Sequence, residues 1–237
     1  MKKAKFSDWL RQSLIFVSLG PWVWAGYTLF TGIILILGRV SLALGIFLSV
    51  TSLFVGVGIA KYIDIKYSAE NPVGFYWAIN KSLPLAVLAA ISIVIFWFVF
   101  MAIANIFSGE LYKIGQFFFN WELTPENLSH QSMRETANWI YGYANVTLMF
   151  VLLMLTTFAS WFSYPLMLFK NYSWSEAKIR GNLAVSKHQK AMYKLLGFIF
   201  AEAILCTTVT PLLTPVLCML TSTMIYVTYK GIFEEVK

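Results

Sequence analysis

Six long apolar runs dominate this sequence, and they restrict the folds that the chain can adopt. An α-helix needs about 20 apolar residues to cross the hydrocarbon core of a bilayer, and each run approaches or exceeds that length. The runs occupy residues 13–38, 41–60, 83–107, 143–169, 192–210 and 212–229. We therefore predict an all-α integral membrane protein with six transmembrane helices and additional interfacial helices, built as a single polytopic domain over residues 1–237.

Charged residues are scarce enough to support this prediction. They make up 12% of the chain, whereas a soluble domain averages about 25%. The formal net charge of +7 would be compatible with nucleic-acid binding in a soluble protein. Here the Lys and Arg residues lie at the ends of the apolar runs, where anionic lipid headgroups attract them. We therefore expect membrane lipids as partners and no nucleic acid.

The first apolar run follows a basic start, MKKAKFSDWLRQ. The run continues to about Leu37, well beyond the core of a cleaved signal peptide, which has roughly 7–15 residues. We therefore expect a retained signal-anchor helix. Gly20 and Pro21 should kink this helix or separate an interfacial foot from the span. Ser7 is the expected N-cap of the foot.

The distribution of Lys and Arg predicts the orientation in the membrane, because cytoplasmic loops carry the excess of positive charge. With six spans, 15 of the 18 Lys and Arg residues fall on one side, and Arg39, Lys113 and Arg134 fall on the other. Six of the 15 lie in the single segment 170–194. We therefore expect both termini and this segment to be cytoplasmic and the 108–141 loop to be outside.

Small residues form a stripe along the second apolar run. They recur at spacings of three and four residues, at Gly45, Ser49, Ser52, Gly56 and Ala60. Such a stripe lets another helix approach closely, which is how helices associate in lipid. A substrate path along the stripe is the alternative interpretation, and close packing is the commoner use.

Two polar intervals contain predicted helix starts. In the first, Asn71 is a capping residue followed by Pro72, and the short aromatic piece after them is expected to lie in the interface. In the outer loop, the aromatic residues of 117–121 indicate an interfacial anchor. The sequence at 124–126, Thr-Pro-Glu, favours a helix that runs towards the fourth span.

The basic segment is predicted to form a helix over 173–191. Ser173 and Glu176 have the spacing of a capping box. Small and apolar residues share one face, and cations lie beside it. The candidate lipid- or partner-binding residues are Trp174, Lys178, Arg180, Lys187 and Lys190. The alternative is a solvated helix that only determines topology.

Glu202 is the ionisable residue placed well inside an apolar run, and an ionisable group in a membrane is a functional candidate. Folding the last two runs into a hairpin is expected to bring it opposite Ser222 and Thr223. With Asn105, near the far end of the third run, these residues form the candidate intramembrane polar site. The alternative is a protonated glutamate that only hydrogen-bonds to its neighbours.

No other residues indicate chemistry. Cys206 and Cys218 lie in apolar runs and are expected to be unreactive packing residues. His130 and His188 are expected on opposite sides of the membrane, so they should not share a metal. Tyr164-Pro165 is expected to mark a kink. Because the familiar catalytic and nucleotide-binding motifs are missing from the sequence, we predict no catalytic residues, no metal and no cofactor.

The last third of the chain resembles known membrane proteins. The stretch FSYPLMLFKNYSWSEAKIRGNLAVSKHQKAMYKLLGF combines a span ending in an aromatic-Pro motif with a Ser-x-x-Glu-Ala helix, and a further hairpin follows. This arrangement resembles uncharacterised bacterial inner-membrane proteins and the membrane part of glycerophosphodiester phosphodiesterases. The chain has no phosphodiesterase catalytic domain, so the resemblance implies a bacterial inner-membrane location and no enzyme activity.

These observations predict a non-enzymatic, multi-pass module of the bacterial cytoplasmic membrane that organises lipids or partner proteins. A protein partner or a second copy of the chain is compatible with this prediction. The alternative is a small secondary transporter that uses Glu202 and the last helical hairpin.

Overall fold

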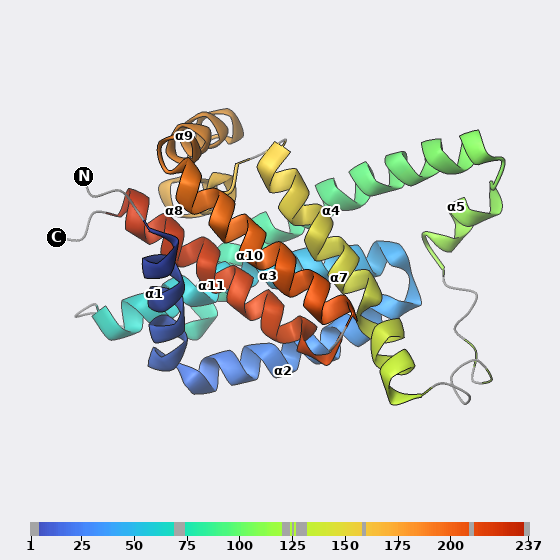
Figure 1. The fold of residues 1–237 in the computed structure, drawn as a ribbon, viewed down its shortest axis with the longest axis horizontal. Helices are drawn as coiled ribbons and strands as arrows, with labels where there is room; N and C mark the ends of the chain where they lie inside the picture. Colours follow the sequence, from blue (N-terminus) through green and yellow to red (C-terminus); the bar gives the residue numbers. More distant parts are fainter. Residues whose placement is uncertain are drawn as a thin grey trace.

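The computed structural model describes residues 5–68, 74–119, 124, 126, 132–157, 160–208 and 211–234. All regular secondary structure in these ranges is helical, which confirms the predicted all-α class. In Figure 1 the helices α3 (Leu42–Ser68) and α11 (Thr214–Phe233) lie in the middle of the molecule, and α4 (Phe75–Ser108) lies at its edge.

The first apolar run is not one continuous helix. α1 (Phe6–Leu19) ends at Gly20, whose φ of −135° and ψ of 58° are not helical, and α2 (Pro21–Leu37) begins at the next residue. Proline suits a first helical position because its missing N–H would have no partner there. The predicted break is confirmed, but the single span 13–38 is wrong, since α1 and α2 run in different directions (Figure 1). The N-cap of α1 is Lys5, so the prediction of Ser7 is also wrong.

A tight connection joins α2 to α3. It is the 3₁₀ turn η1 (Gly38–Val40), and a Cβ on Gly38 would lie 2.7 Å from the Cα of Gly45. The absence of a side chain at residue 38 therefore lets the connection lie against α3. Ser41 caps α3, because its hydroxyl accepts the backbone N–H of Leu44 at 3.0 Å. The predicted run 41–60 is only the first part of α3, which continues to Ser68.

The stripe of small residues on α3 is a packing surface. A Cβ on Gly56 would lie 2.7 Å from the Cβ of Ser222 on α11 and 2.7 Å from the hydroxyl oxygen of Tyr27 on α2. Ser49 and Ala60 on the same stripe are fully buried. The packing interpretation is therefore confirmed, because two neighbouring helices meet α3 at Gly56.

α4 is longer than the third predicted span. The short aromatic piece is the beginning of α4, which starts at Phe75, and its place in the interface stays a prediction. The helix continues through its polar residues because the Ser82 hydroxyl donates to the Ala78 carbonyl at 2.7 Å and packs against Gly58 of α3. The predicted helix start at Asn71 and Pro72 lies outside the described residues.

The loop after α4 begins with a left-handed turn. Gly109 has a φ of 75°, a conformation that favours glycine, and the short helix α5 (Tyr112–Gln116) follows. The carbonyl of Phe117 accepts the N–H of Ala43 at 2.9 Å, which attaches the aromatic segment to the start of α3. The predicted helix start at 124–126 lies largely outside the described residues.

The fourth apolar run is divided as well. α7 (Met133–Thr157) and α8 (Ser163–Lys170) are separate helices, so the predicted span 143–169 is wrong as one element. Trp161, between them, donates its indole N–H to the hydroxyl of Thr228 at 2.9 Å, which attaches the connection to α11. Pro165 lies in the first turn of α8, where proline breaks no helical hydrogen bond. The predicted kink at Tyr164-Pro165 is therefore replaced by a helix start.

The basic helix is shorter than predicted. The hydroxyl of Ser173 accepts the backbone N–H of Glu176 at 3.3 Å, which confirms the N-terminal cap. α9 (Trp174–Lys187) ends at His188, and α10 (Gln189–Thr208) starts at the next residue, so a continuous helix over 173–191 is wrong. The short turn η2 (Pro211–Leu213) and α11 complete the predicted final hairpin.

Four helical segments are long and apolar enough to cross a membrane. They are Pro21–Val40, Leu42–Tyr67, Phe75–Ser108 and Pro211–Phe233, with mean hydropathies between 1.5 and 2.8. A shorter apolar segment, Ala144–Leu155, lies within α7. The membrane-protein class is therefore supported by four candidate spans among the described residues.

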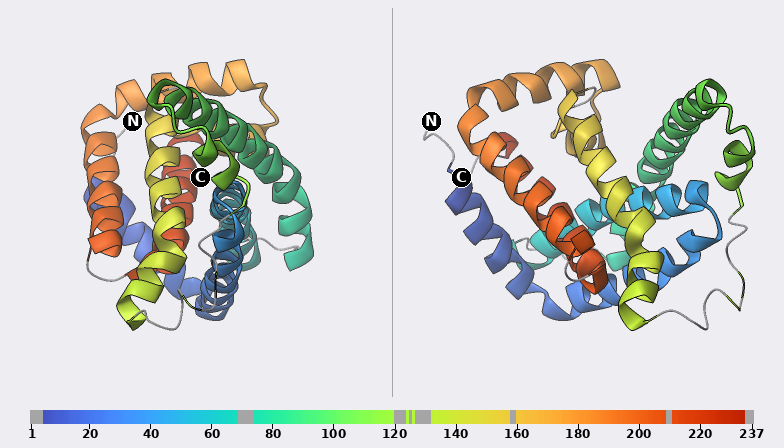
Figure 2. Two further views of the ribbon diagram at one scale, coloured as in Figure 1. Left: turned by 90° about the vertical axis from the view of Figure 1, so that its right-hand side faces the viewer. Right: turned by 45° about the vertical axis from the view of Figure 1, so that its right-hand side comes forward.

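These segments differ in how much of their surface is covered. In the most apolar stretch of each segment, 72% of the Pro211–Phe233 segment is buried inside the protein, whereas only 11% of the Phe75–Ser108 segment is buried. Figure 2 shows α4 leaning away from the other helices towards its C-terminal end. α11 is therefore the centre of the core, and α4 presents most of its apolar surface outwards.

Candidate functional site

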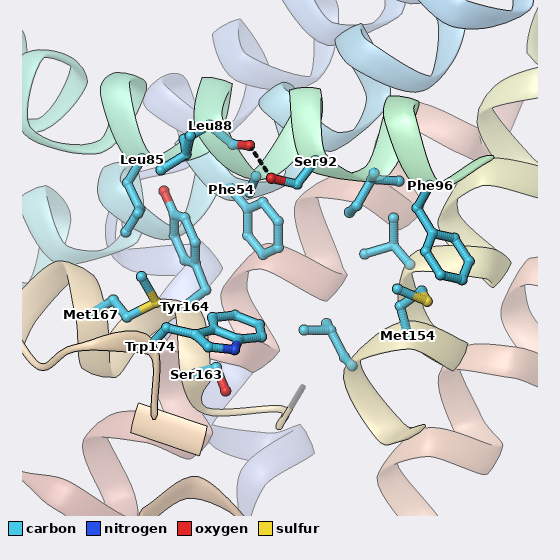
Figure 3. A pocket seen from close by; sticks show the side chains of 14 residues that line it. Phe54, Leu85, Leu88, Ser92, Phe96, Met154, Ser163, Tyr164, Met167 and Trp174 are labelled. Carbon is cyan, nitrogen blue, oxygen red and sulfur yellow. Dashed lines mark hydrogen bonds between the residues drawn. The ribbon is translucent and has the colours of Figure 1, made fainter. Parts of the chain in front are cut away.

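An apolar groove lies where α4 passes α3, α7 and α8. Its volume is about 360 Å³, which falls in the range of about 300–1,000 Å³ found for small-molecule sites. Figure 3 shows the side chains around it. The lining residues are Phe54, Leu85, Leu88, Ala89, Ser92, Ile93, Phe96, Val151, Met154, Leu155, Ser163, Tyr164, Met167 and Trp174.

The hydroxyl groups in the wall of the groove are already bonded to the protein. Ser92 donates its hydroxyl to the Leu88 carbonyl at 2.9 Å (Figure 3). Tyr164 donates its hydroxyl to the Ser82 carbonyl at 3.2 Å, and the Ser163 hydroxyl accepts the N–H of Ser160 at 3.0 Å. Hydrocarbon in the groove would therefore leave none of these hydroxyls unpaired, so the groove suits an apolar occupant.

The start of α8 builds one wall of the groove. Because α8 begins at Ser163, the ring of Tyr164 is directed at α3 and stacks on Phe54 with 4.0 Å between the centroids. Trp174, the first residue of α9, lines the groove and is 52% exposed. A tryptophan with one side on apolar surface and the other accessible is typical of the membrane interface. The predicted site residue Trp174 thus belongs to this groove.

The four predicted basic residues do not form one cluster. Arg180 pairs with Glu176 at 2.9 Å, and its guanidinium lies 4.6 Å from the centre of the Tyr172 ring. Lys178 and Lys187 are also on α9: Lys178 lies between the two members of this pair in the sequence, and Lys187 lies near the end of the helix. Lys190 lies beyond the helix break, on α10. The break separates Lys190 from the other three, because α10 takes a new direction there (Figure 2).

His188 occupies the corner between the two helices. The residue is buried, with 8% of its surface exposed, and its backbone N–H closes α9 by bonding to the Ala184 carbonyl at 3.1 Å. Burial lowers the pKa of His188, and the neighbouring Lys187 ammonium lowers that pKa further. The corner therefore favours neutral imidazole at physiological pH.

The candidate intramembrane polar site is not assembled. Ser222 donates to the Leu53 carbonyl on α3 at 2.7 Å, and Thr223 donates to the Met219 carbonyl at 2.8 Å. Glu202 is half-buried on α10, and no described residue forms a hydrogen bond or ion pair with it. Asn105 is buried at the end of α4, where its carbonyl accepts the N–H of Glu110 at 2.9 Å. The expected pairing of Glu202 with the two hydroxyls is wrong, because both hydroxyls donate to backbone carbonyls and neither accepts a hydrogen bond from Glu202.

A charged cluster at the ends of α3 and α11 was missed by the sequence analysis. Asp64 accepts the Tyr226 hydroxyl at 2.6 Å and the Lys230 ammonium at 2.5 Å. Lys61, one turn earlier on α3, pairs with Glu234 at 2.8 Å. Both pairs cross between α3 and the end of α11, and the paired residues are 173 and 166 positions apart in the sequence. The sequence contains a signal for this cluster, because each of the two helices has a carboxylate one turn from a lysine near its end: Asp64 near Lys61 on α3, and Glu234 near Lys230 at the end of α11.

The remaining predicted positions are consistent with structural roles. Cys206 and Cys218 are buried free thiols, and His130 lies outside the described residues. Within the part of the chain that the structure describes, no three His, Cys, Asp or Glu residues are grouped closely enough to hold a metal ion. Comparison of the chain with protein families, curated proteins and solved structures finds no match.

Proposed function

We propose that the chain is a non-enzymatic, lipid-binding module of a bacterial inner membrane and that the apolar groove holds an acyl chain. The groove is the observation that carries this proposal. Its lining contains no Asp, Glu, His, Cys, Lys or Arg, and its hydroxyls bond to protein groups. Such a surface offers an apolar ligand a contact area but contains no carboxylate, imidazole, amine or thiol for catalysis.

The proposal places six spans in the membrane with both termini in the cytoplasm. The segments α2, α3, α4, α7, α10 and α11 would cross, and α1, α8 and α9 would lie near the cytoplasmic interface. Contacts between the ends of distant helices support this arrangement. Trp9 on α1 lies next to Gly231 on α11, and Lys61 pairs with Glu234. Both contacts therefore join segments that the proposal puts on the cytoplasmic side of the membrane.

The groove would open towards lipid beside the basic helix. Since α4 is mostly exposed, an acyl chain could reach the groove along it without crossing the bundle. Trp174 lines the groove at the start of α9, and Lys178 and Arg180 follow within two turns of the helix. Anionic headgroups are attracted to such cations, while the acyl chain stays in the apolar groove.

The transporter alternative receives less support. A proton or ion site in a membrane needs a carboxylate with polar partners, whereas Ser222 and Thr223 bond to backbone carbonyls and not to Glu202. The alternative predicts that Glu202→Gln abolishes a pH-dependent flux in liposomes. Our proposal predicts that the same variant binds lipid like the wild type.

The experiment fills the groove with a bulky side chain and measures how much lipid stays bound to the purified protein. Ala89 lines the groove on α4, whereas Ala104 lies on the same helix outside the groove and is exposed. We expect Ala89→Trp to purify as a folded protein with at least about tenfold less tightly retained lipid, because a bulky side chain fills the space that the acyl chain occupies. Ala104→Trp is the matched control and should retain lipid like the wild type. Lipid is quantified by native mass spectrometry after detergent exchange.

Three results would contradict the proposal. Equal lipid retention by Ala89→Trp and the wild type would show that the groove holds no lipid. Equal loss in both tryptophan variants would show that retention depends on the outer surface of α4. A stoichiometric protein, or a second copy of the chain, retained in place of lipid would identify this surface as a protein interface.

A further inference from the structure

A second pocket lies between the start of α1 and the start of α10, away from the groove. Its volume is about 290 Å³. It is lined by Lys5, Phe6, Ser7, Lys190, Ala191 and Lys194. Lysines from two elements far apart in the sequence therefore surround one pocket, and no acidic residue contributes to its lining.

The three lysines of the pocket form no ion pair within the described part of the chain. The ion pairs among the described residues involve Lys61, Lys113, Arg180 and Lys230, and none of them includes a lysine of this pocket. Lys190 and Lys194 are four residues apart on α10, a spacing at which like charges repel. Lys5 adds a third positive charge from α1. A bound anion would relieve this repulsion.

The fold holds the two sides of the pocket together. The rings of Phe6 on α1 and Phe198 on α10 are 5.6 Å apart between centroids. Ala191, which lines the pocket between Lys190 and Lys194 in the sequence, is buried. α1 has no side-chain cap, and the positive end of its dipole adds to the field of the lysines, while Asp8 in the same first turn contributes one opposing negative charge.

We propose that this pocket binds the phosphate group of an anionic phospholipid. Three ammonium groups and the hydroxyl of Ser7 are donors that suit phosphate oxygens. Free phosphate has the same chemistry, but a pocket next to helices of a membrane protein meets lipid phosphate at high local concentration. The site is separate from the groove and involves none of its residues, so the two proposals can fail independently.

The test compares variants in nanodiscs of phosphatidylcholine that contain a minority of phosphatidylglycerol. Native mass spectrometry measures the preference of the protein for phosphatidylglycerol. We expect K5Q/K190Q/K194Q to lose roughly 100-fold of this preference, from about fivefold for each basic residue near the surface. The matched control is K66Q/K81Q/K170Q, which removes the same charge from exposed lysines outside the pocket and should keep most of the preference. The variant K5R/K190R/K194R should also keep it.

Each other outcome would overturn the proposal. Unchanged preference in K5Q/K190Q/K194Q would show that the pocket binds no phosphate, and an equal loss in the control would assign the effect to overall charge. Displacement of phosphatidylglycerol by excess inorganic phosphate would show that the ligand is a soluble phosphate. If the triple variant does not fold, Lys194→Gln alone must lower the preference about fivefold.

Discussion

Asp64 on α3 and Tyr226 on α11 share a buried hydrogen bond of 2.6 Å, in which the tyrosine hydroxyl donates to the carboxylate. The other carboxylate oxygen accepts the Lys230 ammonium. The carboxylate thereby connects the two central helices near their ends. Its charge is compensated only as long as α3 and α11 stay in register, so the cluster specifies how these helices align.

Replacing this carboxylate should destabilise the fold. Asp64→Asn keeps an acceptor for Tyr226 but leaves the Lys230 ammonium without its carboxylate, so we expect a loss of about 1–3 kcal/mol in the free energy of unfolding. Thermal unfolding in detergent measures the change. Asp8→Asn, at an exposed position on α1, is the control and should have little effect. A variant as stable as the wild type would show that the cluster does not hold α3 against α11.

The close approach at Gly56 gives a second prediction. Gly56→Ala would place a Cβ 2.7 Å from the side chains of both Ser222 and Tyr27, and such overpacking typically costs about 1–3 kcal/mol. Gly26→Ala on α2 is the matched control, because a Cβ there meets no atom within 4 Å. The control should be neutral or slightly stabilising. Equal unfolding temperatures for the two variants would contradict the packing of α2 and α11 on α3.

The corner at His188 should make stability depend on pH. Since the pKa of His188 is lowered by burial and then by Lys187, the unfolded chain takes up a proton at a higher pH than the folded chain. The stability that neutral His188 provides is therefore complete above the unfolded pKa of about 6.5 and decreases as the pH falls below it. We expect a lower unfolding temperature at acidic pH in the wild type.

His188→Gln tests whether His188 causes this pH dependence, because the glutamine side chain cannot take up a proton near neutral pH. The pH dependence of its unfolding temperature should be shallower than that of the wild type between neutral and mildly acidic pH. Identical pH profiles would show that other groups, and not His188, cause the acid sensitivity.

The proposed orientation can be tested by labelling. Cys206 and Cys218 are buried and can be replaced by alanine, after which single cysteines are introduced at Lys187 and at Lys113. We expect a membrane-impermeant maleimide applied to intact cells to label K113C and to label K187C only after the membrane is opened. Labelling of K187C from outside would reverse the orientation, and labelling of both positions from outside would contradict six spans.

Much of the architecture was predictable from local sequence. The apolar runs predicted helices because a buried or lipid-exposed backbone must satisfy its own hydrogen bonds. Gly20 and Pro21 predicted the break between α1 and α2, and Ser173 with Glu176 predicted the start of α9. Each of these helix boundaries depends on residues that are only a few positions apart in the sequence. The stripe at Gly56 also predicted close packing, although not which helices would fill it.

The candidate sites were less predictable, because they depend on which helix faces lie together. The sequence placed Glu202 opposite Ser222, but the hydroxyl of Ser222 reaches the backbone of α3 instead. It grouped Lys190 with α9, but the helix break places this lysine in a pocket with Lys5, near the other end of the chain. A hairpin fixes which helices are neighbours, whereas their rotation depends on packing against the rest of the bundle.

The sequence by itself determined an all-helical, membrane-type chain and several helix ends, because hydrophobic length and capping are local properties. Only the tertiary structure decided that Asp64 meets Lys230, that Phe54 and Tyr164 form part of one apolar groove, and that Lys5 and Lys194 share a pocket. These contacts join residues distant in the chain, and they arise from the interlocking of side chains between helices, which no short stretch of sequence specifies.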